Sequence, residues 1–216
     1  MKILIASSAG IYDDRYPETK KNNSGFGHMI RTISSMLAAE NNEVHIITQS
    51  NMSRGRKIEN AILYKKSAFD LVRHFKWFYF RKAMELVRMK ELSLGMKART
   101  LLYFMNGSYC EDLIKKEKYD IVHINGIGSR AMPYLFACVR TNTPFAISLH
   151  GLISFDETVK IDECSKKIER LILQELCDNP NIKVSVVSTG IKKRVENYLN
   201  STCLDNIVVI NNPIIK

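Results

Sequence analysis

The sequence lacks any hydrophobic run long enough to cross a membrane. No apolar segment approaches the roughly 18 to 20 residues that span a bilayer. The N-terminal apolar stretch is also too short for a signal peptide, because the charged segment IYDDRYPETKK follows it at residues 11–21. We therefore expect a cytoplasmic protein.

Cysteine is scarce and irregularly spaced. The chain has five cysteines, an odd number, and no two of them form a CxxC motif. This pattern argues against a disulfide framework and against a zinc site, and it favours reduced thiols. We expect no metal centre. The five positions are Cys110, Cys138, Cys164, Cys177 and Cys203.

Acidic residues are outnumbered by basic ones. The 32 Lys and Arg residues against 22 Asp and Glu residues give a formal net charge of +10. Such a charge attracts phosphate groups, whether on nucleotides, anionic lipids or nucleic acids. No recognised nucleic-acid-binding module accompanies the charge, and we therefore expect no nucleic-acid partner.

Short aliphatic runs alternate with helical patterns along the whole chain. Continuous apolar runs are typical of strands that are buried on both faces of a parallel sheet. The alternation predicts an α/β fold, Rossmann-like in having a parallel sheet with helices on both faces. Because no interior linker interrupts the sequence, we expect one domain over residues 1–216. A long helical tract is expected at 69–117, broken near Gly95 or Asn106-Gly107. The expected strands are 2–7, 43–49, 61–67, 119–126, 144–151, 183–188 and 206–213.

The expected fold indicates where a ligand would bind. In open parallel sheets, ligands bind at the carboxyl ends of the strands, where loops lead into helix N-termini. The loop before Gly25, NGIGSR at 125–130, HGLISF at 150–155 and STG at 188–190 should therefore gather at one edge.

Gly25 and Gly27 lie where a helix is expected to begin. A glycine-rich turn at a helix N-terminus offers unpaired amides and a positive dipole end, which suit a phosphate. The alternative is a flexible turn without a ligand. A dinucleotide-binding fold is disfavoured, because SGFGHM at 24–29 lacks the third glycine of GxGxxG and Gln49 stands where an acidic residue is expected.

His150 is expected at the tip of a buried strand, where Gly151 allows a substrate to come close. A histidine there can donate to a sugar hydroxyl or orient a phosphate-bearing group. The alternative is a purely structural histidine. His45 and His123 lie within apolar runs, and we interpret both as core or near-core residues. Ser188 resembles a helix N-cap.

Together these segments resemble GT-B glycosyltransferases, specifically the large family 4 of retaining enzymes. The resemblance covers nearly the whole chain and is weakest across 50–118. It implies a Rossmann-like N-terminal domain that holds the acceptor. The motifs occur in order: MKILIAS, SGFGHMIRTISSMLAAENNEVHIIT, YDIVHINGIG, PFAISLHG, VSVVSTGIKKRVENYL and NIVVINNPI.

The resemblance implies roles for particular residues. Ser24 and Gly25 match the Gly-Gly pair that meets the donor diphosphate, with Ser24 a departure, and Gly27 belongs to the same loop. His150 matches the histidine that contacts the transferred sugar, which makes it the expected catalytic residue. Asn125 and Gly126 match a turn that is often His-Gly. The acceptor and sugar cleft is thus assigned to Asn125, Gly126, Gly151 and Ser188.

One expected feature of such enzymes is missing from the sequence. No two glutamates stand eight positions apart, although the donor-binding C-terminal domain of the family carries a Glu-x7-Glu pair. We therefore expect a portion of a transferase that lacks this domain and is inactive alone. It would act on a nucleotide sugar and a glycan or lipid-linked acceptor, without a cofactor, in building a bacterial surface polysaccharide or glycolipid. The alternative is a non-catalytic binding subunit that pairs with a separate donor-binding chain.

Residues 73–90, RHFKWFYFRKAMELVRMK, mix basic and aromatic side chains. A basic helix with aromatic residues can rest on anionic lipid, which would place the enzyme near a lipid-linked acceptor at the inner face of the membrane. The alternative is an ordinary amphipathic helix whose aromatic residues lie in the core.

Overall fold

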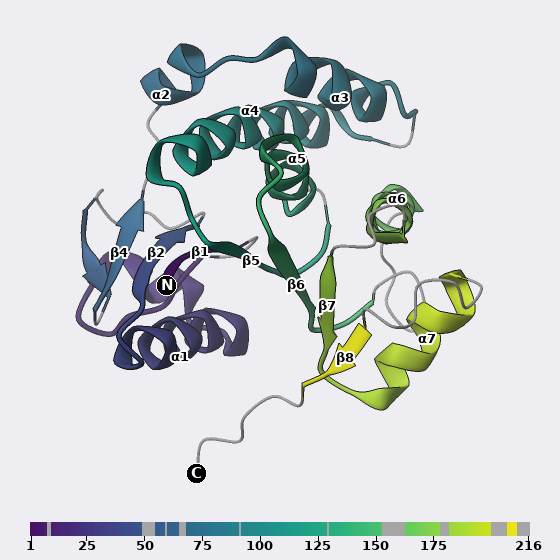
Figure 1. Cartoon of the computed structure of the whole chain (residues 1–216). Helices are drawn as coiled ribbons and strands as arrows, with labels where there is room; N and C mark the ends of the chain where they lie inside the picture. Colours follow the sequence, from purple (N-terminus) through teal and green to yellow (C-terminus); the bar gives the residue numbers. More distant parts are fainter. Residues whose placement is uncertain are drawn as a thin grey trace.

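A mostly parallel sheet forms the centre of the molecule (Figure 1). The computed structural model describes residues 1–7, 10–48, 55–58, 60–64, 68–90, 92–128, 130–152, 163–177, 182–199 and 207–210. The sheet order is β3-β4-β2-β1-β5-β6-β7-β8. The strands are β1 Lys2–Ser7, β2 Glu43–Ile47, β3 Lys57–Ile58, β4 Ala61–Tyr64, β5 Ile121–Asn125, β6 Phe145–Leu149, β7 Lys183–Val186 and β8 Ile207–Val209.

Helices cover both faces of this sheet, as expected from the sequence. In Figure 1, α1 lies on one face, and α4, α5, α6 and α7 fan around the other. This division follows from right-handed crossovers, because the chain leaves β1 in one direction and runs from β4 to β8 in the opposite one. The helices are η1 Pro17–Asn22, α1 Gly25–Ala39, α2 Ala68–Arg73, α3 Trp77–Val87, α4 Leu94–Glu117, α5 Met132–Thr141, α6 Glu163–Cys177 and α7 Thr189–Leu199.

Each face of the sheet has its own hydrophobic core. Leu4, Val122 and Ile147 pack with the helices α3 to α7, whereas Ile5 and Ile30 belong to the core beneath α1. Neighbouring strand positions point to opposite faces, so each of these strands needs apolar residues on both sides. The continuous aliphatic runs of the sequence meet that need.

The helical tract expected at 69–117 is divided into the three helices α2, α3 and α4, so it has one break more than the sequence predicted. The break near Gly95 corresponds to the connection between α3 and α4, where the Ser93 hydroxyl accepts a hydrogen bond from the Met96 amide at 3.3 Å and begins α4. The break expected at Asn106-Gly107 is wrong. α4 continues through Gly107. Glycine is required there by packing, because a Cβ would lie 2.8 Å from the Pro133 Cβ and closer still to the Tyr79 ring.

The sheet also departs from the prediction at its edge. β3 pairs antiparallel with β4, with Lys57 opposite Ile62, and this short strand was not expected. Parts of other predicted segments, including 153–155 and 211–213, lie outside the described residues.

Candidate functional site

The carboxyl ends of the central strands lie side by side. Ser7 of β1 is paired with Asn125 of β5, and Asn125 with Ser148 of β6. β6 pairs in turn with β7, where Leu149 lies opposite Val186. Beyond the end of β5, the Gly126 amide donates a hydrogen bond to the Ser148 carbonyl at 3.0 Å. The loops after these strands therefore start from one edge of the sheet.

The N-terminus of α1 is capped by Ser24. The Ser24 hydroxyl oxygen accepts a hydrogen bond from the Gly27 amide at 3.2 Å, and the Ser24 backbone is extended, as an N-cap requires. The serine that departs from the family's Gly-Gly pair thus begins the helix. The amides of Gly25 and Phe26 fall in the first turn of α1, where no intrahelical acceptor exists.

The fold does not require glycine at position 25. Gly25 is exposed, its φ lies outside the left-handed region, and a Cβ added there would meet nothing within 4 Å. Gly151 has an equally open surrounding. Gly126, by contrast, has a φ of 92°, which favours glycine for conformational reasons.

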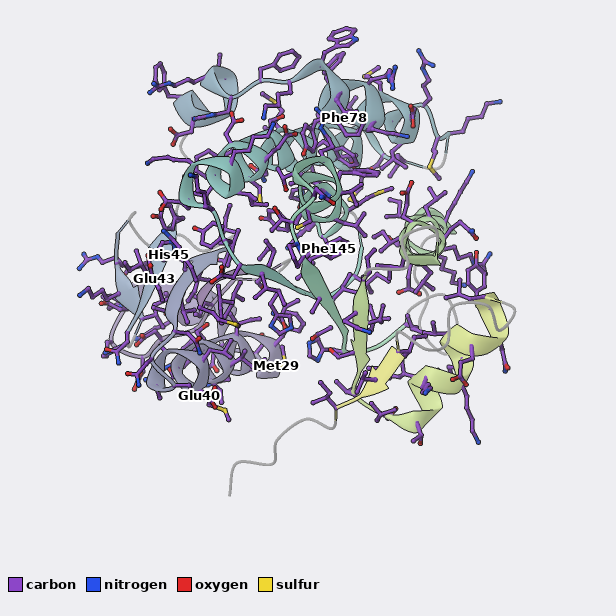
Figure 2. The ribbon with its side chains drawn as sticks, viewed as in Figure 1. Met29, Glu40, Glu43, His45, Phe78 and Phe145 are labelled. Carbon is purple, nitrogen blue, oxygen red and sulfur yellow. The ribbon has the colours of Figure 1, made fainter. Side chains whose placement is uncertain are left out.

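Phe26 connects the α1 N-terminus to His150. Their ring centroids are 5.2 Å apart and the rings are nearly perpendicular, an edge-to-face arrangement. Figure 2 shows Met29, one turn further along, at the end of α1 nearest the middle of the sheet. The glycine turn and the tip of β6 therefore meet, as the strand-end argument expects.

His150 is less open than the sequence suggests. Both of its ring nitrogens are buried. A direct hydrogen bond from His150 to a sugar hydroxyl would require the ring or its surroundings to move.

A polar chain crosses the sheet next to this site. His123 Nε2 lies 2.7 Å from the Ser148 hydroxyl, which in turn lies 2.7 Å from the Ser185 hydroxyl. Burial, with a smaller effect of the His150 charge, lowers the pKa of His123 to about 4, so the ring is neutral at pH 7. The half-buried position of His123 agrees with its interpretation as a core or near-core residue, but the sequence alone does not predict its hydrogen bond with Ser148. The signal lies in the register: these residues share one face of β5, β6 and β7.

Asn125 is fully buried at the end of β5. Neither its side-chain oxygen nor its side-chain nitrogen has a hydrogen-bond partner among the described residues. A buried amide without partners costs about 1–3 kcal/mol for each group, so such a residue demands an explanation. Its position beside the strand ends makes a ligand one explanation.

Ser188 confirms the N-cap interpretation. Its hydroxyl accepts a hydrogen bond from the Ile191 amide at 3.2 Å, and its carbonyl accepts from the Lys192 amide. Ser188 stands at the same edge as the other predicted residues, since it follows β7. Its assignment to the sugar cleft stays a prediction.

Within the described ranges, no group of three or more His, Cys, Asp or Glu residues could hold a metal ion. Cys110 and Cys138 are buried, and neither forms a disulfide bond with a described residue. No helix of the described part is long and apolar enough to cross a membrane. Gln49 lies outside the described residues.

A family model for Glycosyltransferase Family 4 matches residues 23–215. The chain belongs to this family. The family identification made from the sequence motifs is thereby confirmed. A search of curated proteins found no significant match.

Solved structures with the same fold place this family 4 chain among GT-B proteins. Sucrose-phosphate synthase from Thermosynechococcus elongatus is 15% identical with a TM-score of 0.56, and the alignment covers 97% of this chain and 47% of that one. UDP-GlcNAc 2-epimerase from Methanocaldococcus jannaschii is also 15% identical, with a TM-score of 0.51. That alignment covers 98% of this chain and 46% of the epimerase chain. The chain therefore spans less than half the length of each.

Proposed function

We propose that this family 4 chain is the acceptor-side domain of a retaining glycosyltransferase. It would take part in moving a sugar from a nucleotide-sugar donor to a glycan or lipid-linked acceptor. The observation that carries the proposal is the contact of Phe26 with His150, because it brings a helix N-terminus, whose amides suit an anion, next to a histidine at a strand end.

The helix N-terminus suits the leaving group of such a reaction. When the glycosidic bond breaks, negative charge develops on the nucleoside diphosphate, and positioned dipoles lower the barrier by meeting that charge. The Gly25 and Phe26 amides and the positive end of α1 offer such dipoles. The openness around Gly25 supports this role, because the absent side chain leaves room for a phosphate at the backbone.

Asn125, Gly126 and Gly151 would line the sugar and acceptor side of the cleft. The buried Asn125 amide carries a donor and an acceptor, which match the two hydrogen-bonding roles of a sugar hydroxyl. His150 would contact the transferred sugar after a local rearrangement exposes its ring nitrogens. The nucleotide sugar is a substrate here, and we propose no resident cofactor or metal.

The remaining machinery would come from a donor-binding domain that follows this one. The absence of a Glu-x7-Glu pair supports this division, as does the chain's cover of less than half of the compared structures. Residues 1–216 by themselves would then be inactive. A cytoplasmic location, with contact between residues 73–90 and an anionic membrane, completes the proposal.

The test compares residues 1–216 with the product of the whole reading frame that contains them. Both are incubated with a panel of labelled nucleotide sugars and glycan or lipid acceptors, and the anomeric configuration of the product is determined by NMR. We expect transfer with retention by the whole product and none by residues 1–216. Transfer by residues 1–216 would contradict the division of labour, and inversion would contradict the retaining mechanism.

The same assay distinguishes the alternative function. If the reading frame ends at Lys216, and transfer appears only when a separate donor-binding chain is added, the protein is a binding subunit. This alternative is tested by mixing residues 1–216 with the products of neighbouring genes and repeating the transfer assay.

A further inference from the structure

α2 and the beginning of α3 carry large apolar side chains that point into solvent. These helices form the outermost layer of the molecule, beyond α4 and away from the sheet (Figure 1). Monomeric proteins rarely expose large contiguous apolar patches without a function. The exposed fractions are 72% for Phe69, 71% for Val72, 46% for Phe75 and 66% for Trp77.

The aromatic residues of this region divide into an inner and an outer set. Tyr79 is fully buried and donates a hydrogen bond to Glu111 at 3.1 Å, and Phe78 contacts Phe136 of α5 edge-to-face. The outer rings contact one another instead. The Phe80 centroid lies 5.1 Å from that of Trp77 and 6.0 Å from that of Phe75.

Two arginines lie one helical turn from members of the outer set: Arg73 is four residues after Phe69 on α2, and Arg81 is four residues after Trp77 on α3. Arg73 and Arg81 are exposed, and neither forms an ion pair with a described residue. Lys76 is different, because it is paired with Asp112 and with Glu111 at 3.0 Å on the inner side. The outward charge of this region is thus carried by guanidinium groups that remain available for anions.

We propose that Phe69, Val72, Phe75 and Trp77, flanked by Arg73 and Arg81, form a docking surface for an anionic lipid bilayer. We call this set the α2–α3 surface. Tryptophan and phenylalanine partition into the headgroup boundary, and arginine near an anionic membrane strengthens the binding electrostatically. The net charge of +10 supports the same partner. The whole of α3 cannot form the membrane contact, because Phe78 and Tyr79 face inward. The exposed residues of the α2–α3 surface provide a better-defined contact.

This inference deepens the proposed function, because a membrane would bring the protein to a lipid-linked acceptor. The binding itself needs neither sugar nor catalysis. Failure of vesicle binding and failure of sugar transfer are therefore separate results.

Trp77 provides a direct probe, because it is the single tryptophan of the sequence. The 216-residue chain is titrated with vesicles of phosphatidylcholine containing 30% phosphatidylglycerol, and with pure phosphatidylcholine vesicles. We expect the tryptophan emission to shift to shorter wavelength with the anionic vesicles, and lipids brominated near the headgroup to quench it. High salt should weaken the binding, since exposed charges are screened.

Two variants and a matched control define the surface. The double variant Phe69→Ser/Phe75→Ser keeps the tryptophan and should weaken vesicle binding at least tenfold. Arg73→Gln/Arg81→Gln should remove the preference for anionic vesicles. Met36→Ser changes a side chain that is 57% exposed on α1, across the sheet, and should leave binding unchanged. Circular dichroism and urea unfolding verify that each variant is folded.

Several outcomes would overturn the proposal. These are no emission shift with anionic vesicles, unchanged binding by the folded Phe69→Ser/Phe75→Ser variant, or equal weakening by Met36→Ser. Sedimentation velocity tests for one further outcome, the association of two copies of the chain. If the wild type is a dimer and the Phe69→Ser/Phe75→Ser variant a monomer, the surface joins two copies of this chain instead.

Discussion

At the scale of single residues, the candidate site combines groups that the fold needs with groups that it does not. Gly126 has a backbone conformation that favours glycine, and the hydroxyls of Ser24 and Ser188 cap helices. Gly25 and Gly151 have no comparable structural reason to be glycine. Residues of the second kind are those at which a substitution tests function without disturbing the fold.

Gly25→Ala should separate these two effects. The added methyl group meets no neighbour, and alanine favours helix, so the free energy of unfolding should stay equal or rise by up to about 1 kcal/mol. The affinity of the whole reading-frame product for a nucleotide sugar should fall at least tenfold, because the methyl group would occupy the approach of the phosphate. Urea unfolding and calorimetric titration measure the two quantities. Undiminished donor affinity would mean that the diphosphate does not approach Gly25.

His123 should make the fold sensitive to mild acid. Its pKa is about 4 in the folded chain against about 6.5 in the unfolded chain, so below pH 6.5 only the unfolded state takes up the proton. Stability attributable to this residue is therefore complete above pH 6.5 and is lost as the pH falls toward 4. Between pH 7.5 and 5 the loss should be roughly 1 to 2 kcal/mol.

The variant His123→Gln should remove this part of the acid sensitivity, because glutamine does not titrate and still reaches Ser148 as a hydrogen-bonding group. Burial also lowers the pKa of His45, which acts in the same direction in both proteins and cancels in the comparison. Urea unfolding of wild type and variant at pH 7.5 and 5 gives the difference. An identical pH dependence in the two proteins would show that His123 is accessible to protons in the folded state.

At the scale of elements, α4 organises the helical layer above the sheet. α4 contacts α3 on one side and α5 on another. Its polar and apolar residues are mixed around the helix and form no single apolar face. Close packing at Gly107 and a buried carboxylate at Glu111 are the features that hold these helices together.

Gly107→Ala should destabilise the protein by about 2 kcal/mol, because the new methyl group would overlap with Tyr79 and Pro133. Gly95→Ala provides the control on the same helix, since its surroundings are open, and it should be neutral or stabilising by up to about 1 kcal/mol. Thermal unfolding of both variants checks the pair. Equal stabilities would contradict the close packing of α3, α4 and α5.

Glu111→Gln should cost about 3 kcal/mol. Burial would raise the pKa of this carboxyl, but hydrogen bonds from Lys115, Arg140 and Lys76 hold it at about 2. Its stabilising effect is therefore present above the unfolded-state pKa near 4.5 and is lost as the pH falls toward 2. Glu85→Gln, which breaks an exposed pair with Lys82, should change stability by less than about 1 kcal/mol. Urea unfolding at pH 7 compares the two variants. Similar losses in the free energy of unfolding would refute the stabilising role of the Glu111 carboxylate.

At the scale of the whole molecule, the sequence was sufficient for the parallel part of the sheet, for the family and for the shared edge at which the central strands end. Buried parallel strands are visible as aliphatic runs, and these runs fix the order of elements. The division of 69–117 was not predictable, because the polar residues of α4 obscure its periodicity and Gly107 resembles a helix breaker until Tyr79 is seen against it. The polar chain from His123 to Ser185 was missed because it depends on strand register.

The inward and outward aromatic residues of 73–90 were also beyond the sequence. Trp77, Phe78, Tyr79 and Phe80 are consecutive, so their hydrophobicity alone does not indicate which ones are buried. Tertiary packing of α3 on α4 and α5 decides this, and it assigns Tyr79 to the core and Trp77 to solvent.

The central claim is that the edge formed by the α1 N-terminus and the end of β6 is the site of sugar transfer. The most direct measurement is hydrogen exchange of the backbone amides in the whole reading-frame product, with and without a saturating nucleotide sugar. The account predicts new protection at 25–27 and at 150–152, with no change in the α2–α3 surface. Protection confined to other parts of residues 1–216, or none in them at all, would contradict the account.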